Sequence, residues 1–271
     1  MRRVTDGVVL ALALSALAAP RAVVAQIDYR NLDDDRPTRV EDAYPVERFA
    51  FEFLVPYAFE RERSGTAIHA SILELAYGLL PNAHVGFKAP LAATRQAGMT
   101  DWGLSGLKAF ALYNFNTEGA LLPALSLRAD AVVPVGSLGG DETQLAVKAL
   151  ATRSWGRARL HLNGAVRLTP DAAAAVVEAL ERWWAGAALD RTFFRQSVLL
   201  VGEVTMGRAI AAAALEVNGG LGLRWQWRPT TVFDVGIARR LKRNVGPDYA
   251  LTLGISSAFA IAALMPNDLG R

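Results

Sequence analysis

The sequence of 271 residues has no cysteine and three histidines. An exported chain without cysteine has no disulfide framework, and it cannot carry the lipid anchor that requires a cysteine after the signal peptide. The same scarcity leaves few ligands for a transition metal. The acidic run Asp33–Asp35 is typical of a solvated segment, so we predict neither a metal site nor a cofactor.

The sequence also lacks a hydrophobic run of the roughly 20 residues that a membrane-spanning helix requires. The apolar stretch Val8–Ala19 has 12 residues and follows Arg2 and Arg3. Small residues then precede Gln26 in the pattern of a cleavage site. We predict that residues 1–25 are a secretory signal peptide and that the protein is exported.

The mature chain also has no large excess of positive or negative charge. Cleavage removes three arginines and one aspartate, which leaves 29 − 3 = 26 basic and 26 − 1 = 25 acidic residues. This near-zero balance predicts no nucleic-acid partner. Hydrophobic residues nevertheless make up 52% of the chain, and its mean hydropathy is +0.21. An exported chain this apolar without a spanning helix favours a transmembrane β-barrel, whose strands carry one outward apolar residue in two.

Alternation in polarity is what the sequence does contain. Around Arg159, His161 and Asn163, each polar residue is followed by an apolar or small one. A helix would need a period of 3.6 residues, which mixes the two classes here. In segment 102–114 the alternation places Lys108 on the same face as Trp102. The predicted strands are 47–60, 67–79, 83–92, 102–114, 121–134, 143–154, 157–168, 182–192, 197–206, 214–228, 231–241 and 248–260.

These strands predict an all-β fold, a single transmembrane antiparallel up-and-down β-barrel of about 12 strands over residues 47–261. Tight turns at 80–82, 155–156 and 228–230 alternate with longer connections at 135–142 and 169–180. Barrels have short turns on the periplasmic side, where aromatic residues should lie at the lipid–water interface. The predicted lipid-interface aromatics are Phe49, Tyr77, Tyr113, Trp155, Trp225, Trp227 and Phe259.

The two ends of the mature chain lie outside the predicted barrel. Residues 26–46 are polar and rich in aspartate, and we predict that this segment stays unpaired in the periplasm. Residues 262–271 form a C-terminal tail. The last strand ends near Phe259 in a pattern that resembles the signal that barrels present to their assembly machinery. The predicted partners are therefore outer-membrane lipid and, during insertion, the barrel-assembly machinery.

The polar faces of the strands are predicted to line the lumen. Cross-strand ion pairing inside a narrow barrel is the favoured interpretation, and a polar constriction or solute site in a pore is the other. Barrels of about eight strands are filled by side chains and those of 16–18 are open, so 12 strands indicate a narrow passage. The lumen-lining candidates are Glu52, Glu74, Lys88, Lys108, Arg128, Asp130, Lys148, Arg159, His161, Asn163, Arg167, Asp190, Glu203, Glu216, Asn218, Arg224, Asp234 and Arg240.

One pair of residues raises the alternative of a lipid-modifying enzyme. His69 and Ser71 share a strand face, two residues apart. A nucleophile and its base also need a third group that orients the base, and the sequence places no obvious acid beside them. We therefore predict no enzymatic activity and no catalytic residue.

A resemblance to a known family rests on five segments, Glu41–Phe53, Glu74–Leu91, Leu122–Gly136, Ala151–Gly164 and Leu189–Phe193. They resemble the outer-membrane barrels of the family named after the MetA pathway of phenol degradation. The resemblance extends over nearly the whole mature chain. It implies a barrel in the outer membrane of a Gram-negative bacterium and the passage of aromatic or other small organic compounds.

Together these features predict an outer-membrane channel or transporter for small, aromatic or hydrophobic organic solutes. Two alternatives remain. A closed structural barrel would bind a partner with its outer loops, and a lipid-modifying barrel would use His69 and Ser71.

Overall fold

The computed structural model describes residues 22–24, 27–62, 64–169, 175–177, 180–194, 197–208, 214–242 and 247–265. Most of the predicted signal peptide therefore lies outside the described residues. Its last part forms β1 (Ala22–Val24), which pairs antiparallel with the end of β15 (Tyr249–Ile261). After β15 the chain continues into the short 3-10 helix η2 (Ala262–Leu264). Among the described residues, no helix is long and apolar enough to cross a membrane.

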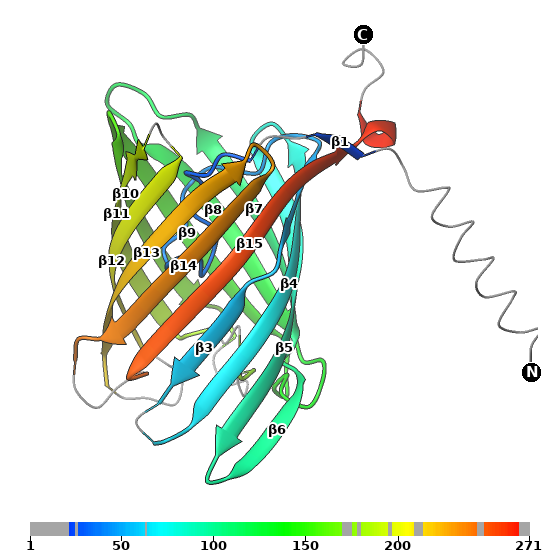
Figure 1. The fold of residues 1–271 in the computed structure, drawn as a ribbon, viewed down its shortest axis with the longest axis vertical. Helices are drawn as coiled ribbons and strands as arrows, with labels where there is room; N and C mark the ends of the chain where they lie inside the picture. The colour runs from blue at the N-terminus through cyan, green and yellow to red at the C-terminus, as the bar shows by residue number, and fades with distance from the viewer. Residues whose placement is uncertain are drawn as a thin grey trace, which may run out of the picture.

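The strands form one closed antiparallel barrel (Figure 1). They are β2 (Ala50–Leu54), β3 (Tyr57–Arg61), β4 (Ala67–Leu80), β5 (Ala83–Gln96), β6 (Met99–Leu104), β7 (Leu107–Asn116), β8 (Ala124–Val133), β9 (Gln144–Trp155), β10 (Ala158–Arg167), β11 (Trp183–Phe193), β12 (Val198–Arg208), β13 (Glu216–Arg228), β14 (Thr231–Arg240) and β15. β2 with β3, and β6 with β7, each make up one barrel strand, so the barrel has 14 − 2 = 12 strands. β15 closes it by pairing with β14 on one edge and with β2 and β3 on the other. The predicted fold class is confirmed.

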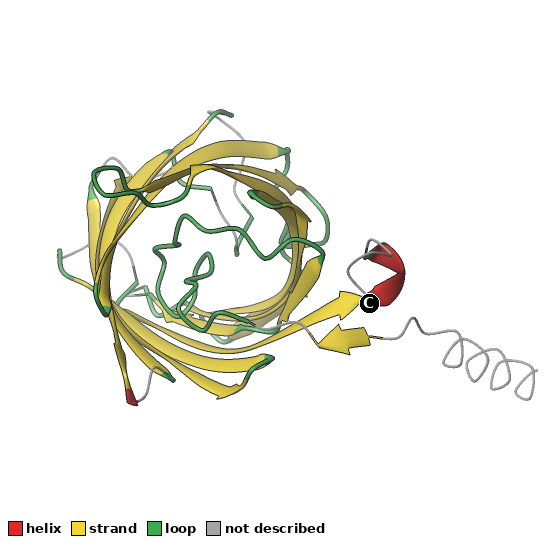
Figure 2. Ribbon diagram, turned by 90° about the horizontal axis from the view of Figure 1, so that it is seen from above, coloured by secondary structure: helices red, strands yellow, loops and turns green. Residues whose placement is uncertain are grey.

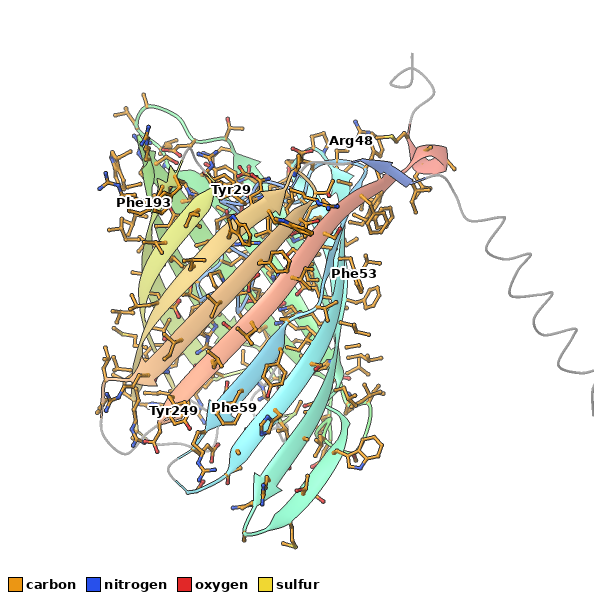
Figure 3. All side chains as sticks on the ribbon, in the orientation of Figure 1. Tyr29, Arg48, Phe53, Phe59, Phe193 and Tyr249 are labelled. Atoms are coloured by element: carbon orange, nitrogen blue, oxygen red, sulfur yellow. The ribbon has the colours of Figure 1, made fainter. Side chains whose placement is uncertain are left out.

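Alternate residues face outward along the strands, because successive side chains of a strand point to opposite sides. In β7, Leu107 and Tyr113 are exposed, whereas Lys108 and Asn114 are buried on the lumen side. Large apolar side chains cover the outer surface, among them Phe53 (Figure 3). In water, such exposure would cost about 25 cal/mol per Å² of apolar area, so this surface suits a lipid environment.

The barrel strand made of β6 and β7 is interrupted at Gly106, and the interruption changes which residues face the lumen. Gly106 has a φ of +80°, a conformation that residues with a Cβ rarely adopt. Before it, Trp102 pairs with Ala93 and is 73% exposed on the outer face. After it, Lys108 pairs with Lys88 and is 5% exposed. The prediction that Trp102 and Lys108 share a face is wrong because this bulge shifts the alternation.

Aromatic side chains gather at both ends of the outer surface. At the short-turn end, the ring of Phe51 stacks on Tyr77 and Phe259, with centroids 4.5 and 5.3 Å apart. At the opposite end, Phe59 lies 5.9 Å from Tyr249 (Figure 3). The sequence predicts interface aromatics only at the short-turn end, where it identifies Tyr77 and Phe259 but not Phe51. Exposed or half-exposed in the structure are Phe49, Tyr77, Tyr113, Trp155, Trp225, Trp227 and Phe259.

The N-terminal segment differs most from its prediction, because it lies inside the barrel rather than unpaired in the periplasm. Residues 27–46, here called the plug, run through the lumen as a loop (Figure 2). Leu32, Arg36, Val40 and Asp42 of the plug are each at most 2% exposed. There are two physical reasons. The polar side chains of the plug meet opposite charges on the lumen wall, and its apolar side chains, such as Leu32 and Val40, pack in one cluster with apolar residues of the wall.

Candidate functional site

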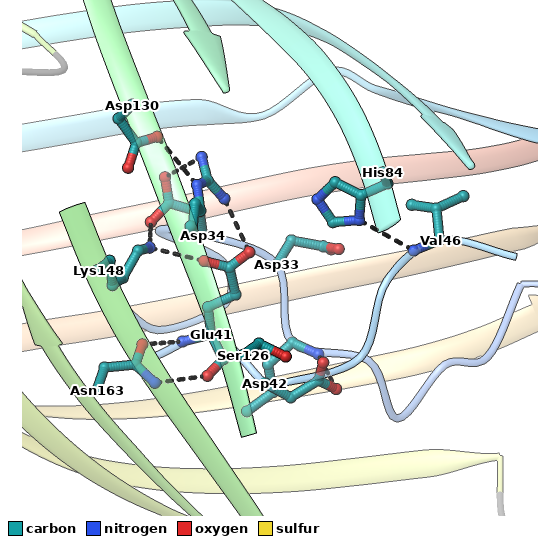
Figure 4. Close-up of polar contacts among 12 residues, drawn as sticks. Asp33, Asp34, Glu41, Asp42, Val46, His84, Ser126, Asp130, Lys148 and Asn163 are labelled. Carbon is teal, nitrogen blue, oxygen red and sulfur yellow. Dashed lines mark hydrogen bonds and ion pairs between the residues drawn. The ribbon is translucent and has the colours of Figure 1, made fainter. Parts of the chain in front are cut away.

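The plug enters and leaves the lumen at the end of the barrel that has the short turns (Figure 1). Where it enters, Ile27 donates its backbone N–H to the Pro229 carbonyl at 2.9 Å. Where it leaves, Val46 donates its backbone N–H to Nδ1 of His84 at 3.0 Å (Figure 4). The plug is therefore a loop that is fastened at both of its ends near the same rim.

Four cations from β5, β7, β8 and β9 gather around one carboxylate of the plug. This cationic cluster consists of Lys88, Lys108, Arg128 and Lys148, each at most 5% exposed. Asp34 contacts them at N···O distances of 3.1, 2.9, 3.0 and 2.5 Å, respectively. Burial alone would raise the pKa of Asp34, but Arg128 and the three lysines hold it well below the ordinary value of 3.8. Asp34 therefore stays ionised within the cluster.

A second plug carboxylate binds the same wall. Glu41 accepts from Lys148 at 2.6 Å and from Arg128 at 2.8 Å (Figure 4). Asn163 holds the Glu41 backbone, because it donates to the Glu41 carbonyl and accepts from the Glu41 N–H, both at 2.8 Å. Arg128 and Lys148 face each other across neighbouring strands and would repel, so the plug carboxylates stabilise the wall as well as the plug.

Two arginines of the plug pair with acidic residues on the opposite wall. Arg36 pairs with Asp234 of β14 at 3.2 Å, and Arg39 pairs with Glu181, just before β11, at 2.9 Å. Glu203 of β12 accepts the backbone N–H groups of Arg39 and of the residue after it, at 3.0 and 2.9 Å. Asp34 and Glu41 thus face β5–β9, and the two arginines face β11–β14. Asp33 of the plug also faces that second wall, where it pairs with Arg224 of β13 at 2.9 Å.

Strands β10 and β11 carry a buried ion-paired group that touches the plug. Arg159 pairs at 2.7 Å with Asp190, its cross-strand neighbour. His161 bonds Asp190 through Nε2 and Thr152 through Nδ1, both at 3.0 Å. Asp42 of the plug lies 3.5 Å from Arg159. Cross-strand pairing, the interpretation favoured from the sequence, describes these residues, and the plug adds a further acid to them.

Glycines in β13 and β14 make room for the plug. A Cβ on Gly236 would lie 1.7 Å from the carbonyl oxygen of Pro37, and one on Gly222 would lie 2.7 Å from Pro37 Cγ. Real Cβ atoms essentially never approach other atoms closer than 3.0 Å. The plug therefore packs directly on the backbone of the wall. Strand glycines in a sequence indicate close packing, but only the structure identifies the N-terminal segment as the partner.

A cavity of about 470 Å³ lies beside the plug and extends toward the long-loop end of the lumen. Asp34 and the three lysines of the cationic cluster line it, as do Glu62 and Pro247 next to the long loops. Apolar side chains such as Ile72 and Trp184 line the space between. Charged side chains such as Glu60, Arg39 and Glu203 also line it. A concave site that combines apolar surface with charged groups suits a small organic molecule with a polar group.

The structure brings most of the lumen-lining candidates to the plug or its neighbours. Arg167, Glu216, Asn218 and Arg240 are only partly buried, and they bond instead to residues close to them at the long-loop end. The plug residues Asp34, Arg36 and Glu41 are missing from the candidates, since an aspartate-rich segment is typical of a solvated one. The buried candidates are Glu52, Glu74, Lys88, Lys108, Arg128, Asp130, Lys148, Arg159, His161, Asn163, Asp190, Glu203, Arg224 and Asp234.

The pair considered for lipid chemistry lies on the outer surface. His69 bonds through Nδ1 to the hydroxyl of Tyr57 at 2.7 Å, and Ser71 faces Tyr57 across β3 and β4. Among the described residues, the His69 ring therefore bonds to a tyrosine rather than to the serine. Among the described residues, no three His, Asp or Glu side chains are arranged to hold a metal ion.

Comparison with solved structures finds the same architecture in outer-membrane channels. The COG4313 outer membrane channel from Pseudomonas putida F1 has a TM-score of 0.60 at 14% identity, over 80% of this chain and 98% of that one. The KdgM porin in complex with disordered oligogalacturonate has a TM-score of 0.53 at 10% identity, over 75% and 98%. The NanC porin has a TM-score of 0.53 at 6% identity, over 76% and 98%.

At these identities the likeness shows the fold, which is that of outer-membrane β-barrels. No family model and no curated protein matches the sequence. The resemblance to the MetA-pathway family therefore stays a prediction.

Proposed function

We propose that this protein is a channel in the outer membrane of a Gram-negative bacterium, and that it passes small organic solutes when the plug moves out of the lumen. The similar solved structures are named as channels or porins, which supports a role in transport. The resemblance to the MetA-pathway family and the apolar side chains of the cavity favour aromatic or hydrophobic solutes. Export by the signal peptide and insertion by the assembly machinery belong to the same proposal.

The observation that carries this proposal is a lumen too wide for the wall's own side chains to fill. Barrels of about eight strands are filled by side chains from the wall. In this barrel, residues 27–46 occupy the lumen and a cavity of about 470 Å³ remains beside them. The plug is held by apolar contacts of residues such as Leu32 and Val40, and by ion pairs and hydrogen bonds, which water can replace when the plug leaves. A hydrated passage results from that exchange.

A closed structural barrel is the second candidate. The contacts of Asp34 with four cations favour it, because buried ion pairs that lose one partner cost about 3–5 kcal/mol. The two candidates differ in one property, which is whether the plug leaves its seat in the intact protein.

A reversible disulfide between the plug and the barrel wall distinguishes the channel from the closed barrel. A Cβ on Gly186 of β11 would lie 2.8 Å from Cγ2 of Val40 in the plug. Cysteines at both positions are therefore near the Cβ separation of about 3.5–4.5 Å that a disulfide requires. The chain has no other cysteine, so the Val40→Cys, Gly186→Cys double variant forms one defined cross-link.

The measurement is the current through planar bilayers that contain the purified mature protein. We expect the oxidised double variant to pass no current and its reduced form to conduct, while oxidation leaves Val40→Cys alone unchanged. Equal currents from the oxidised and reduced double variant would show that the plug is not the gate. An absence of current from the reduced variant and from the wild type would favour the closed barrel.

A further inference from the structure

The cationic cluster is paired with acids of both the lumen wall and the plug. Among the described wall residues, Glu74 lies 3.6 Å from Lys88, and Asp130 lies 3.6 Å from Lys108 and 2.9 Å from Arg128. The plug adds the carboxylates of Asp34 and Glu41, which contact the cluster. When the plug leaves, these two carboxylates leave the cluster, and its four cations stay on the wall.

The Asp34 carboxylate occupies this cluster as a bound anion would. One oxygen, Oδ2, lies 3.1, 2.9 and 3.0 Å from Lys88, Lys108 and Arg128, and Oδ1 lies 2.5 Å from Lys148. Each oxygen thus has its own cationic partners. Charge-assisted hydrogen bonds of this kind are about twice as strong as neutral ones. The four cations all contact the carboxylate group itself, and Lys88 also donates to the Asp34 backbone carbonyl at 3.2 Å.

The neighbouring cavity selects what is attached to such a carboxylate. Asp34 and the three lysines of the cluster line the cavity, and Ile72, Val177 and Trp184 line it farther along. The Trp184 ring lies 5.7 Å from Nζ of Lys148, so an apolar surface begins next to the cations. Glu41 is not among the described residues that line the cavity. A molecule in this space therefore reaches one carboxylate position, that of Asp34.

We propose that the cationic cluster is a binding site for small monocarboxylates with an apolar body, and that Asp34 occupies it while the plug is seated. A carboxylate solute that enters from the long-loop end competes with Asp34 and so loosens the segment that blocks its way. This inference deepens the proposed function and rests on it for the passage of the bound solute. Binding itself is measured without any transport.

Benzoate is the probe, and benzamide is its uncharged analogue of nearly the same shape. The Asp34→Asn variant removes the competing charge and keeps the size of the side chain. We expect calorimetric titration of the full mature protein to show that this variant binds benzoate at least about tenfold more tightly than the wild type does, a difference of about 1.4 kcal/mol. Benzamide should bind both proteins equally.

Two further variants serve as controls. Asp28→Asn removes an exposed plug acid that pairs with Arg30, and it should leave benzoate affinity at the wild-type level. Adding Lys148→Met to Asp34→Asn removes one of the proposed ligand's partners and should reverse the gain in affinity. A change of gel migration on heating shows that each barrel is folded.

A second measurement keeps Asp34 in place and applies even where Asp34→Asn does not fold. In the Val40→Cys, Gly186→Cys variant, benzoate should slow disulfide formation several-fold by displacing the plug, and benzamide should not. Equal effects of the two compounds in both measurements would overturn the carboxylate site. Benzoate binding without any current would refute the channel and leave the site. Current with no preference for benzoate in binding would refute the site and leave the channel.

Discussion

Gly236 of β14 packs so closely on the plug that one added methyl group should displace the plug. A Cβ there would lie 1.7 Å from the carbonyl oxygen of Pro37 and 2.8 Å from its carbonyl carbon. Ordinary contact begins at 3.4 Å, so the plug must move by about 3.4 − 1.7 = 1.7 Å. The strand itself cannot retreat, because Gly236 is paired with Gly222 on one side and with Thr252 on the other.

The magnitude follows from the contacts that such a movement breaks. Thr252 donates through Oγ1 to the Pro37 carbonyl at 3.0 Å, and the preceding Arg36 pairs with Asp234 at 3.2 Å. A hydrogen bond contributes about 0.5–1.5 kcal/mol, and separating a buried ion pair costs about 3–5 kcal/mol when the partner stays buried. Water that enters the opened lumen solvates Asp234, so we take the lower end of this range. The free-energy cost of the movement is then about 3 kcal/mol. This shifts the equilibrium from seated to released plug on the order of 100-fold.

The assay is the fraction of time that single proteins spend conducting in a planar bilayer, for Gly236→Ala against Gly164→Ala. Gly164 in β10 is the matched control, because a Cβ there meets no atom within 4 Å. Both changes remove a strand glycine, so the loss of backbone freedom is the same. We expect the conducting fraction to rise on the order of 100-fold for Gly236→Ala and to stay at the wild-type value for Gly164→Ala.

One result would refute this reasoning. The Gly236→Ala protein could be folded, as judged by its gel migration, and yet conduct no more often than Gly164→Ala. In that case the plug does not gate the barrel. Loss of folding in Gly236→Ala would instead show that the plug and the wall form a single unit.

Three further perturbations address the pH response, the barrel and the enzyme alternative. The pKa of Asp34 is held well below 3.8 in the seated plug by Arg128 and three lysines, against the effect of burial. The ionised Asp34 carboxylate therefore stabilises the seated plug fully above pH 3.8, and this stabilisation is lost as the pH falls below that value. The current should rise below about pH 4. The Asp34→Asn variant should not show this rise. Gly106→Val should lower the free energy of unfolding in urea by about 1–2 kcal/mol, because a β-branched residue resists a positive φ; an unchanged midpoint would contradict the bulge. Incubated with phospholipid vesicles, the wild type and Ser71→Ala should release equally little fatty acid; release by the wild type alone would revive the enzyme.

The strands of this barrel were predictable because each depends on neighbouring residues. The alternation around His161 predicts a strand at 157–168, and the structure has β10 at Ala158–Arg167. Local pattern fails where the backbone departs from the regular pleat. At Gly106 the positive φ turns Lys108 inward and leaves Trp102 outside, and a sequence shows a glycine there without showing its dihedral angle.

The candidate site was predictable only on the wall side. Arg128, Lys148 and Asn163 were identified as inward residues from alternation, and all three are buried. Their partners in the plug were not, because an aspartate in an irregular segment carries no periodicity. Asp34 pairs with Lys108 and Lys148, which are 74 and 114 residues away in the chain.

The sequence by itself therefore determined the barrel, its approximate strand number and the faces of its strands, since strand geometry relates each side chain to its nearest neighbours in the chain. Only the tertiary structure decided what fills the lumen. Closing twelve strands into a ring brings four cations from separate strands around one space, and that convergence, rather than any local pattern, gives Asp34 and the plug their place.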